Sequence, residues 1–146
     1  MRPRLLLFAA LLLSTISTLS ACADPGPGAE DVAGCGSCER EVADIRTQLE
    51  ALDGITMVKR VEFIPESPTN GSGVDIELRS SQPSEGDLAS EAARIVWQSR
   101  VQPVEVVNIS IKLADGSMAQ LLPYDFRETS REHASYVEEW GERPVE

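Results

Sequence analysis

The sequence predicts a single α+β domain in which a four-stranded antiparallel sheet carries helices on one face. Segments with apolar residues at helical spacing alternate with segments of strand periodicity, in the order α-β-β-α-β-β-α. Residues 74–79 alternate strictly between apolar and charged side chains, which predicts one buried and one solvated sheet face. The 146-residue chain is long enough for one domain with its own core.

The first half of the domain is expected to form a helix and two strands. Residues 38–52 are predicted to be helical because apolar side chains recur at 3-4-3 spacing, at Val42, Ile45, Leu49 and Leu52. Residues 55–64 are rich in β-branched residues and predict a strand, with one face formed by Ile55, Met57, Val61 and Phe63. Pro65 and Pro68 are expected to end this strand. Residues 74–79 form the second strand.

The second half repeats this order and adds a closing helix. A helix beginning at Ser84 or Asp87 and running to about residue 100 has an apolar face formed by Leu88, Ala92, Ile95 and Val96. Residues 104–113 predict the strongest strand, and Asp115-Gly116 favours a hairpin turn. The returning strand, residues 118–122, is expected to stop at Pro123. The last helix covers residues 130–140, with Thr129 and Glu132 at the spacing of a capping box.

This order of elements resembles a circularly permuted ferredoxin-like domain, in which the final strand takes the place of the usual first one. That arrangement requires the last two strands to be neighbours, which the hairpin turn permits. Two further stretches, Ala93-Arg94-Ile95-Val96-Trp97 and Gly141-Glu142-Arg143-Pro144, resemble small exported bacterial proteins of unassigned function. The second resemblance implies a fold and brings no activity with it.

The N-terminus has the parts of an export signal. Arg2 and Arg4 precede an apolar run, residues 5–13, that is too short to span a bilayer, for which about 20 residues are needed. Leu19-Ser20-Ala21-Cys22 then resembles the lipobox of bacterial lipoproteins. The resemblance implies that Cys22 becomes the mature N-terminus and carries diacylglycerol and palmitate-type acyl chains. It also implies an anchor on the extracytoplasmic face of the cell membrane.

The remaining chain divides into two parts by composition. Residues 22–34 are rich in proline, glycine and acidic residues and predict a flexible tether. Residues 35–146 form the predicted domain. Residues 1–21 contain two of the 13 basic residues and none of the 24 acidic ones, so the mature chain has 11 against 24 and a formal charge of −13. This charge excludes nucleic acid as a partner, because a phosphate backbone would repel it.

Cys35-Gly36-Ser37-Cys38 is the one motif that predicts a chemical site. The two cysteines could form a local disulfide or stay idle, which export to an oxidising compartment allows. They could also do thiol redox chemistry, because a helix N-terminus lowers the pKa of a thiol. The stretch from Gly34 to Cys38, a helix, and then Leu52-Asp53-Gly54-Ile55 resembles the start of a heavy-metal-associated domain. That resemblance implies binding of copper(I) by Cys35 and Cys38.

No set of residues predicts an enzyme. His133 is the only histidine, so it supports no Ser-His-Asp or Cys-His arrangement, and it is expected to be solvated or at an interface. No glycine-rich loop has a phosphate-binding pattern, and no resident cofactor is expected. We therefore expect a non-enzymatic lipoprotein that binds a protein or an envelope component. The alternative is a metal-binding or redox module that uses Cys35 and Cys38.

Overall fold

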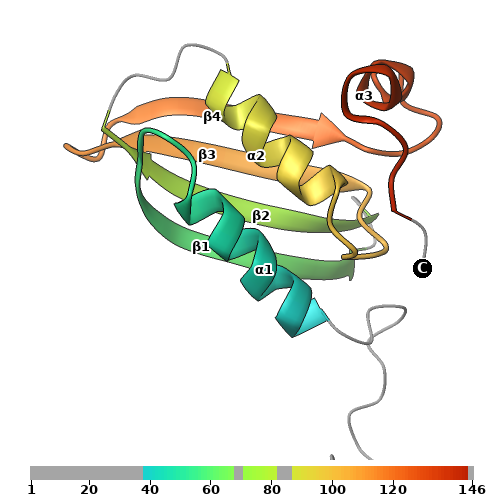
Figure 1. Ribbon diagram of the computed structural model, residues 1–146, viewed down its shortest axis with the longest axis horizontal. Coiled ribbons are helices and arrows are strands. Elements are labelled where there is room, and N and C mark those ends of the chain that lie inside the picture. Colours follow the sequence, from blue (N-terminus) through green and yellow to red (C-terminus); the bar gives the residue numbers. More distant parts are fainter. Residues whose placement is uncertain (1–37, 68–70, 82–86, 145–146) are drawn as a thin grey trace, which may run out of the picture.

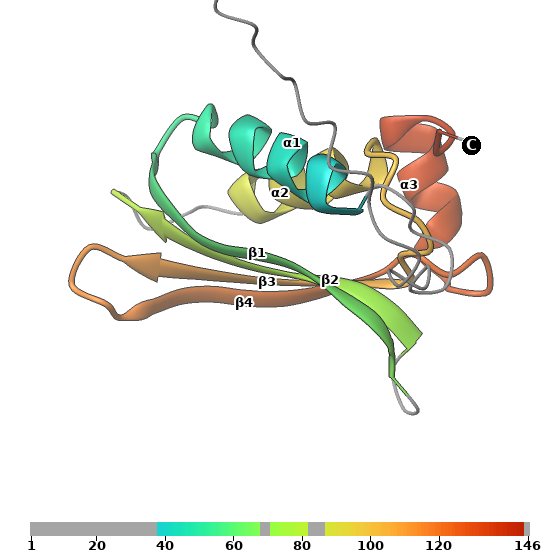
Figure 2. The same cartoon turned by 90° about the horizontal axis from the view of Figure 1, so that it is seen from below.

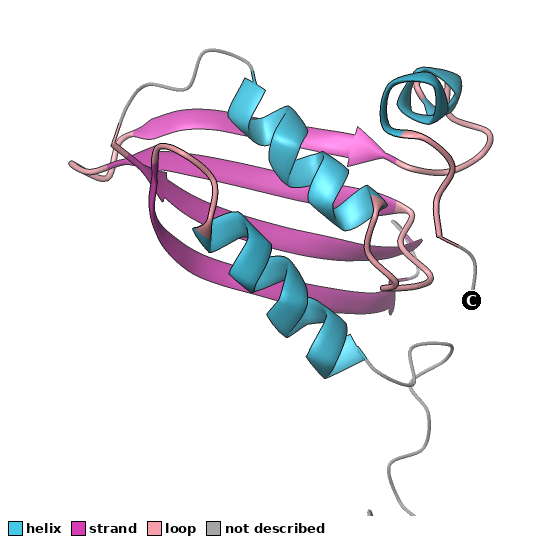
Figure 3. Cartoon of the chain, viewed as in Figure 1, coloured by secondary structure: helices cyan, strands magenta, loops and turns pink. Residues whose placement is uncertain are grey.

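The computed structural model describes residues 38–67, 71–81 and 87–144, which form a sheet with helices on one side (Figure 1). The elements are α1 (Cys38–Glu50), β1 (Ile55–Ser67), β2 (Gly71–Ser80), α2 (Asp87–Trp97), β3 (Val106–Leu113), β4 (Met118–Asp125) and α3 (His133–Trp140). The view turned by 90° places all three helices on the same side of the sheet (Figure 2). The predicted α+β class, the order of elements and the one-sided helical layer are confirmed (Figure 3).

The sheet is mixed, and in this the prediction of a wholly antiparallel sheet was wrong. The strands lie in the order β1-β2-β3-β4, with an antiparallel hairpin on each side. The two central strands, β2 and β3, pair in parallel from Gly73↔Val106 to Ser80↔Leu113. Parallel neighbours need a crossover connection, and α2 provides it between them (Figure 1). The pattern of apolar residues along these strands does not show whether the neighbouring strand runs parallel or antiparallel, so the sequence did not predict the parallel pair.

The strand order also differs from that of a permuted ferredoxin-like domain. In that arrangement the last strand would lie between β2 and β3. Here β4 is the outer strand and pairs with β3 alone, although the last two strands are neighbours as expected. The fold is therefore two αββ units joined through a parallel pair of strands.

Helices α1 and α2 cover the sheet because their apolar stripes meet a face of β-branched side chains. Fully buried residues of the helices are Ile45, Leu49, Ala89, Ala92, Ala93 and Val96. Those of the sheet, all at most 2% exposed, are Val74, Ile76, Leu78, Val107, Ile109 and Ile111. The three alanines have small side chains, so α2 can lie close to the strands. Burial of this apolar area, at roughly 25 cal/mol per Å², is the main force that holds the two layers together.

Strand β1 is irregular, and the irregularity corrects the predicted position of Met57. Pairing with β2 shifts register between Ile55 and Met57 and again between Val58 and Arg60. A bulge adds one residue to one strand and changes the phase of its alternation. Val58 is therefore buried, whereas Met57 is 49% exposed. Arg46 of α1 donates a hydrogen bond from Nη1 to the Val58 carbonyl oxygen at 2.9 Å, which ties the helix to this part of the strand.

Pro65 and Pro123 lie inside β1 and β4 and do not end these strands as predicted. Both strands are edges of the sheet, where a residue without an N–H group is tolerated. The backbone N–H of Phe126 donates to the Glu105 oxygen at 2.7 Å. In an antiparallel pair, the N–H groups of successive residues point alternately toward the partner strand and away from it. The N–H of Phe126 points toward β3, and Pro123 lies an odd number of residues earlier, so the nitrogen of Pro123 points toward the free edge of the sheet. Pro123 thus opposes the addition of a further strand there.

Helix α3 packs through a cluster of aromatic rings. Trp97, which is fully buried, contacts the rings of Phe126, His133, Tyr136 and Trp140 at centroid distances between 5.1 and 6.1 Å. Tyr136 and Trp140 stack at 4.7 Å. Such ring pairs contribute about 0.5–1.5 kcal/mol each beyond their buried area. Trp97 therefore belongs to the core, and Trp140 docks α3 against it. His133 is half-buried against Trp97, which is a structural position.

The segment after α3, residues 141–144, is bound across the loop that joins α2 to β3, and we call it the C-terminal strap. Trp97 Nε1 donates to the Gly141 oxygen at 2.8 Å, and Gln102 Nε2 donates to the Pro144 oxygen at 2.6 Å. The Arg143 guanidinium donates to the carbonyl oxygens of Val104 and Val101, at 2.9 and 3.4 Å. It also lies over the rings of Trp97 and Phe126, 5.5 and 5.6 Å from their centroids. Burial lowers the pKa of Arg143 from its usual value.

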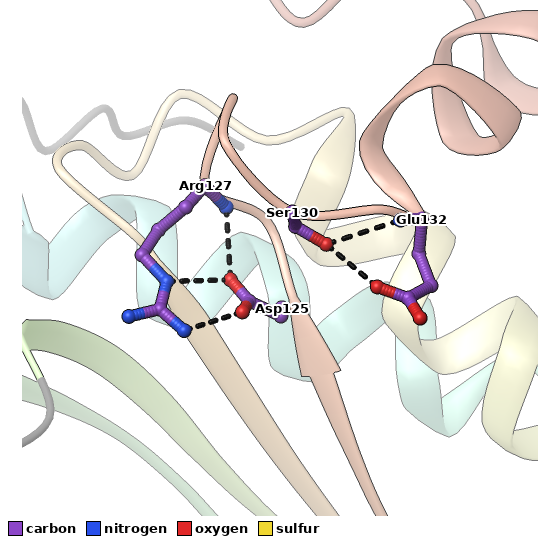
Figure 4. Close-up of polar contacts among 4 residues, drawn as sticks. All are labelled: Asp125, Arg127, Ser130 and Glu132. Atoms are coloured by element: carbon purple, nitrogen blue, oxygen red, sulfur yellow. Dashed lines mark hydrogen bonds and ion pairs between the residues drawn. The ribbon is translucent and has the colours of Figure 1, made fainter.

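The link between β4 and α3 is ordered by short-range polar contacts (Figure 4). Arg127 donates from Nε to Asp125 Oδ1 at 2.8 Å and forms an ion pair with Oδ2 through Nη2. This hydrogen-bonded pair lowers the pKa of Asp125 and raises that of Arg127. The predicted capping box of Thr129 and Glu132 does not form. Instead, Ser130 donates to Glu132 Oε2 at 2.8 Å, and α3 begins only at His133.

The predicted signal peptide (1–21), the tether (22–34), Cys22 and Cys35 lie outside the described residues. Within the described part of the chain, none of the helices combines the length and apolar character that a bilayer crossing requires.

Candidate docking surface on the open face of the sheet

The sheet face opposite the helices has no covering layer among the described residues, and we call it the open face (Figure 2). Residues that pair directly across neighbouring strands share a face, so the ladders identify its members. They include Met57, Arg60, Glu62, Asp75, Glu77, Arg79, Asn108, Ser110, Lys112, Met118, Leu121 and Pro123. The outward positions of Asp75, Glu77 and Arg79 confirm the solvated face that the sequence predicted.

The open face has an ordered arrangement of charges. Lys112 Nζ donates to Glu77 Oε1 at 2.8 Å. This hydrogen bond, with the charges of Lys112, Arg60 and Lys59, lowers the pKa of Glu77. Asn108 Nδ2 donates to Asp75 Oδ1 at 2.9 Å. The carboxylates of β2 are thus engaged with donors on the same face.

Two arginines of the open face keep hydrogen-bonding capacity. Arg60 approaches Glu62 and Asp75 at 3.7 Å each, too far for a hydrogen bond, and its side chain is 50% exposed. Arg79 Nη1 donates to the Ala114 oxygen at 3.4 Å, and its Nε is buried without a hydrogen-bond partner in the described part of the chain. A guanidinium has five N–H donors. The exposed guanidinium of Arg60 therefore offers donors that a ligand with acceptor groups could use.

A trough of about 360 Å³ lies on this face between a charged wall and an apolar wall. Arg60 and Asp75 form the charged wall, and Leu121 and Pro123 form the apolar wall. Between them lie Asn108 and Ser110, together with Ile76 of β2, whose side chain is buried in the core. The Ser110 hydroxyl makes no hydrogen bond within the described residues, so it is available in the trough.

Large apolar side chains are exposed around the trough. Leu121 is 65% exposed, Met118 is 54% exposed and Met57 is 49% exposed. Leu122, the next residue of β4, is 38% exposed on the opposite face. Exposed apolar residues that gather beside polar groups are typical of interaction sites, and methionine adapts well to different partners.

The charge of the open face contrasts with that of the helical layer. The chain's two lysines, Lys59 and Lys112, lie on β1 and β3, and the arginines of the open face accompany them. Exposed carboxylates instead gather on the helices, at Glu39, Asp44, Glu50, Asp87, Glu91, Glu138 and Glu139. On the open face, Arg60, Arg79 and Lys112 lie among the carboxylates of Glu62, Asp75 and Glu77, so cations and carboxylates are interspersed there.

The predicted site at the cysteines is only partly described. Cys38 is the first residue of α1, is half-buried and takes part in a disulfide. Within the described residues no group of three or more His, Cys, Asp or Glu side chains is placed to hold a metal ion. The pairing of Cys35 with Cys38 and the binding of copper stay predictions.

Sequence reasoning did not identify Arg60, Leu121 or Pro123 as parts of a site. The bulges in β1 interrupt the alternation of its side chains, so the sequence does not show that Arg60 faces outward. Residues 118–122 show no clear alternation of apolar and polar side chains. The one signal in the sequence was the alternation of residues 74–79, which predicts the solvated face but not its trough. Comparison of the chain with protein-family models, with curated proteins and with solved structures gave no match.

Proposed function

We propose that this protein is a lipoprotein anchored at the extracytoplasmic face of the cell membrane, with a non-enzymatic role in which the open face docks a protein of the envelope. The observation that carries the docking proposal is the trough, where guanidinium donors without hydrogen bonds lie opposite exposed apolar side chains. Pro123 and the bulges of β1 protect the sheet edges, which favours docking by side chains over strand addition.

The lipobox resemblance supports the anchor, and it gives a direct test. Changing Cys22 to alanine should release the protein from the membrane fraction or leave it as an unprocessed precursor, because position 22 then has no thiol to accept diacylglycerol. Two acyl chains are needed for stable anchoring, at roughly 0.8 kcal/mol per buried CH₂. Fractionation and intact mass of the Cys22→Ala variant measure this. Normal processing with retention in the membrane would contradict the anchor.

Docking is tested by site-specific photo-crosslinking in intact cells. A benzoylphenylalanine at position 121, on the open face, should give one defined adduct with another envelope protein. The same group at position 122 reports the opposite face of the same strand, and at Glu91 it reports the exposed side of α2. We expect no adduct at these two control positions. Equal adducts at all three positions, none at position 121, or an adduct with twice the mass of the chain would overturn docking of a partner.

A second function uses the cysteines. The disulfide of Cys38 at the start of α1 favours a structural clip or a thiol-redox module over resident copper, because a disulfide sulfur is not a thiolate ligand. Alkylation of the purified protein before and after reduction distinguishes the functions. Thiols that are modified without reduction, together with one copper(I) per chain, would favour metal binding by Cys35 and Cys38.

A further inference from the structure

The trough has one charged wall and one apolar wall, and this difference limits which ligands can occupy it. The carboxylates in and beside the charged wall already have donors. Asp75 of the wall accepts from Asn108, and Glu77, which lies on the same face outside the trough, accepts from Lys112. The guanidinium of Arg60 contacts only two carboxylates at 3.7 Å and makes no hydrogen bond within the described residues. The charged wall therefore has free hydrogen-bond donors, and a ligand that binds there must supply hydrogen-bond acceptors.

Arg60 can leave its two ion pairs and bind a ligand at a small cost in free energy. Its two ion pairs are at the surface, and exposed pairs of this kind contribute about 0–1 kcal/mol. A carboxylate that binds the guanidinium through two parallel hydrogen bonds makes a stronger contact than either pair at 3.7 Å. The hydroxyl of Ser110 lies in the same trough and can donate to the same acceptor.

The opposite wall requires apolar groups. Leu121 and Pro123 line it, and Leu121 is 65% exposed. A polyanionic polymer or a sheet of lipid headgroups would leave this leucine against charged groups. It would also bring a dense layer of negative charge against Glu62, Asp75 and Glu77, which share the face. A protein segment can instead place one acidic side chain at Arg60 and keep its other side apolar.

We propose that the trough of the open face takes an acidic, amphipathic segment of a partner protein, with a carboxylate on Arg60 and apolar side chains against Leu121 and Pro123. This inference rests on the proposed docking function and adds the chemistry of the partner. An extended segment in which acidic and apolar residues alternate fits the two walls, because successive side chains point to opposite sides.

The test uses the full-length lipoprotein in nanodiscs of phosphatidylcholine and two fluorescent twelve-residue peptides. One peptide alternates leucine and glutamate, and the other alternates leucine and lysine. A chain with formal charge −11 or below attracts the lysine peptide through its overall field. A preference for the glutamate peptide in fluorescence anisotropy would therefore come from a local site. We expect that preference, and we expect Arg60→Glu to lower the affinity for the glutamate peptide at least tenfold.

Two further variants separate the site from general electrostatics and from misfolding. Arg40→Glu makes the same charge change at an exposed position of α1, on the other side of the sheet, and should change the affinity less than threefold. Leu121→Ser changes the apolar wall at an exposed position and should weaken binding without affecting the fold. Equal effects of Arg60→Glu and Arg40→Glu would overturn the inference, as would a preference for the lysine peptide or no binding of the glutamate peptide.

Vesicles of phosphatidylglycerol serve as a competitor. These vesicles could displace the glutamate peptide from the wild type, and this displacement could be lost in Arg60→Glu. That result would mean that the trough binds a lipid surface and not a protein segment. The docking function fails separately, through the absence of an adduct at position 121. An adduct there without a preference for the glutamate peptide would leave docking in place and remove the proposed chemistry of the partner.

Discussion

Replacement of Trp97 by alanine should lower the free energy of unfolding by about 3–5 kcal/mol. The indole is fully buried and contacts four other rings, so alanine leaves a large cavity between α2, α3 and Phe126. It also removes the donor to the Gly141 oxygen, at 2.8 Å. Urea unfolding followed by far-ultraviolet circular dichroism measures the change.

The control for this prediction is Leu121→Ala. The Leu121 side chain is 65% exposed, and surface changes of this kind usually alter stability by less than about 0.5 kcal/mol. If Trp97→Ala cost no more than this control, the aromatic cluster would not hold α3 to the domain. Loss of amide protection confined to α3 would show that only this helix has detached.

Arg143→Met should lower the free energy of unfolding by about 1–3 kcal/mol. Methionine keeps the apolar stem but loses the hydrogen bonds to the oxygens of Val104 and Val101. It also loses the cation–π contacts with Trp97 and Phe126. Part of this loss is offset because a buried cation is itself disfavoured, as the lowered pKa of Arg143 indicates. Urea unfolding and hydrogen exchange of the C-terminal strap measure the effect.

Arg143→Lys distinguishes charge from geometry. A lysine keeps the charge but lacks the planar fork that reaches two carbonyl oxygens, so its stability should lie between wild type and Arg143→Met. A methionine variant as stable as wild type would mean that desolvation of the guanidinium outweighs its contacts. In that case the C-terminal strap would depend on Trp97 and Gln102 for its attachment.

Several sequence predictions rested on local patterns and are confirmed for that reason. The 3-4-3 spacing in residues 38–52 places Ile45 and Leu49 in the core. The Asp115-Gly116 turn forms as expected: the Gly116 φ of +87° lies in the left-handed region. Asp115 accepts hydrogen bonds from the hydroxyl and N–H of Ser117, and these lower its pKa. Each of these features depends on residues within a few positions of one another.

Other predictions failed where the deciding contact is distant in sequence. Pro123 continues a strand because β4 is an edge, which the residues around the proline do not reveal. Met57 is exposed because bulges against β2 change the phase of β1. The docking surface combines Arg60 with Leu121, from opposite edges of the sheet.

The sequence by itself determined the order of elements, the helical faces that pack on the sheet and the existence of a solvated sheet face. These features follow from the spacing of apolar side chains within each segment, with a period of about 3.6 residues in a helix and about 2 in a strand. The lipobox at Cys22 remains a prediction of the same local kind. Only the tertiary structure decided the parallel pairing of β2 and β3, the trough and the burial of Arg143. Each of these depends on which distant segments become neighbours, and that choice is made by the packing of the whole domain.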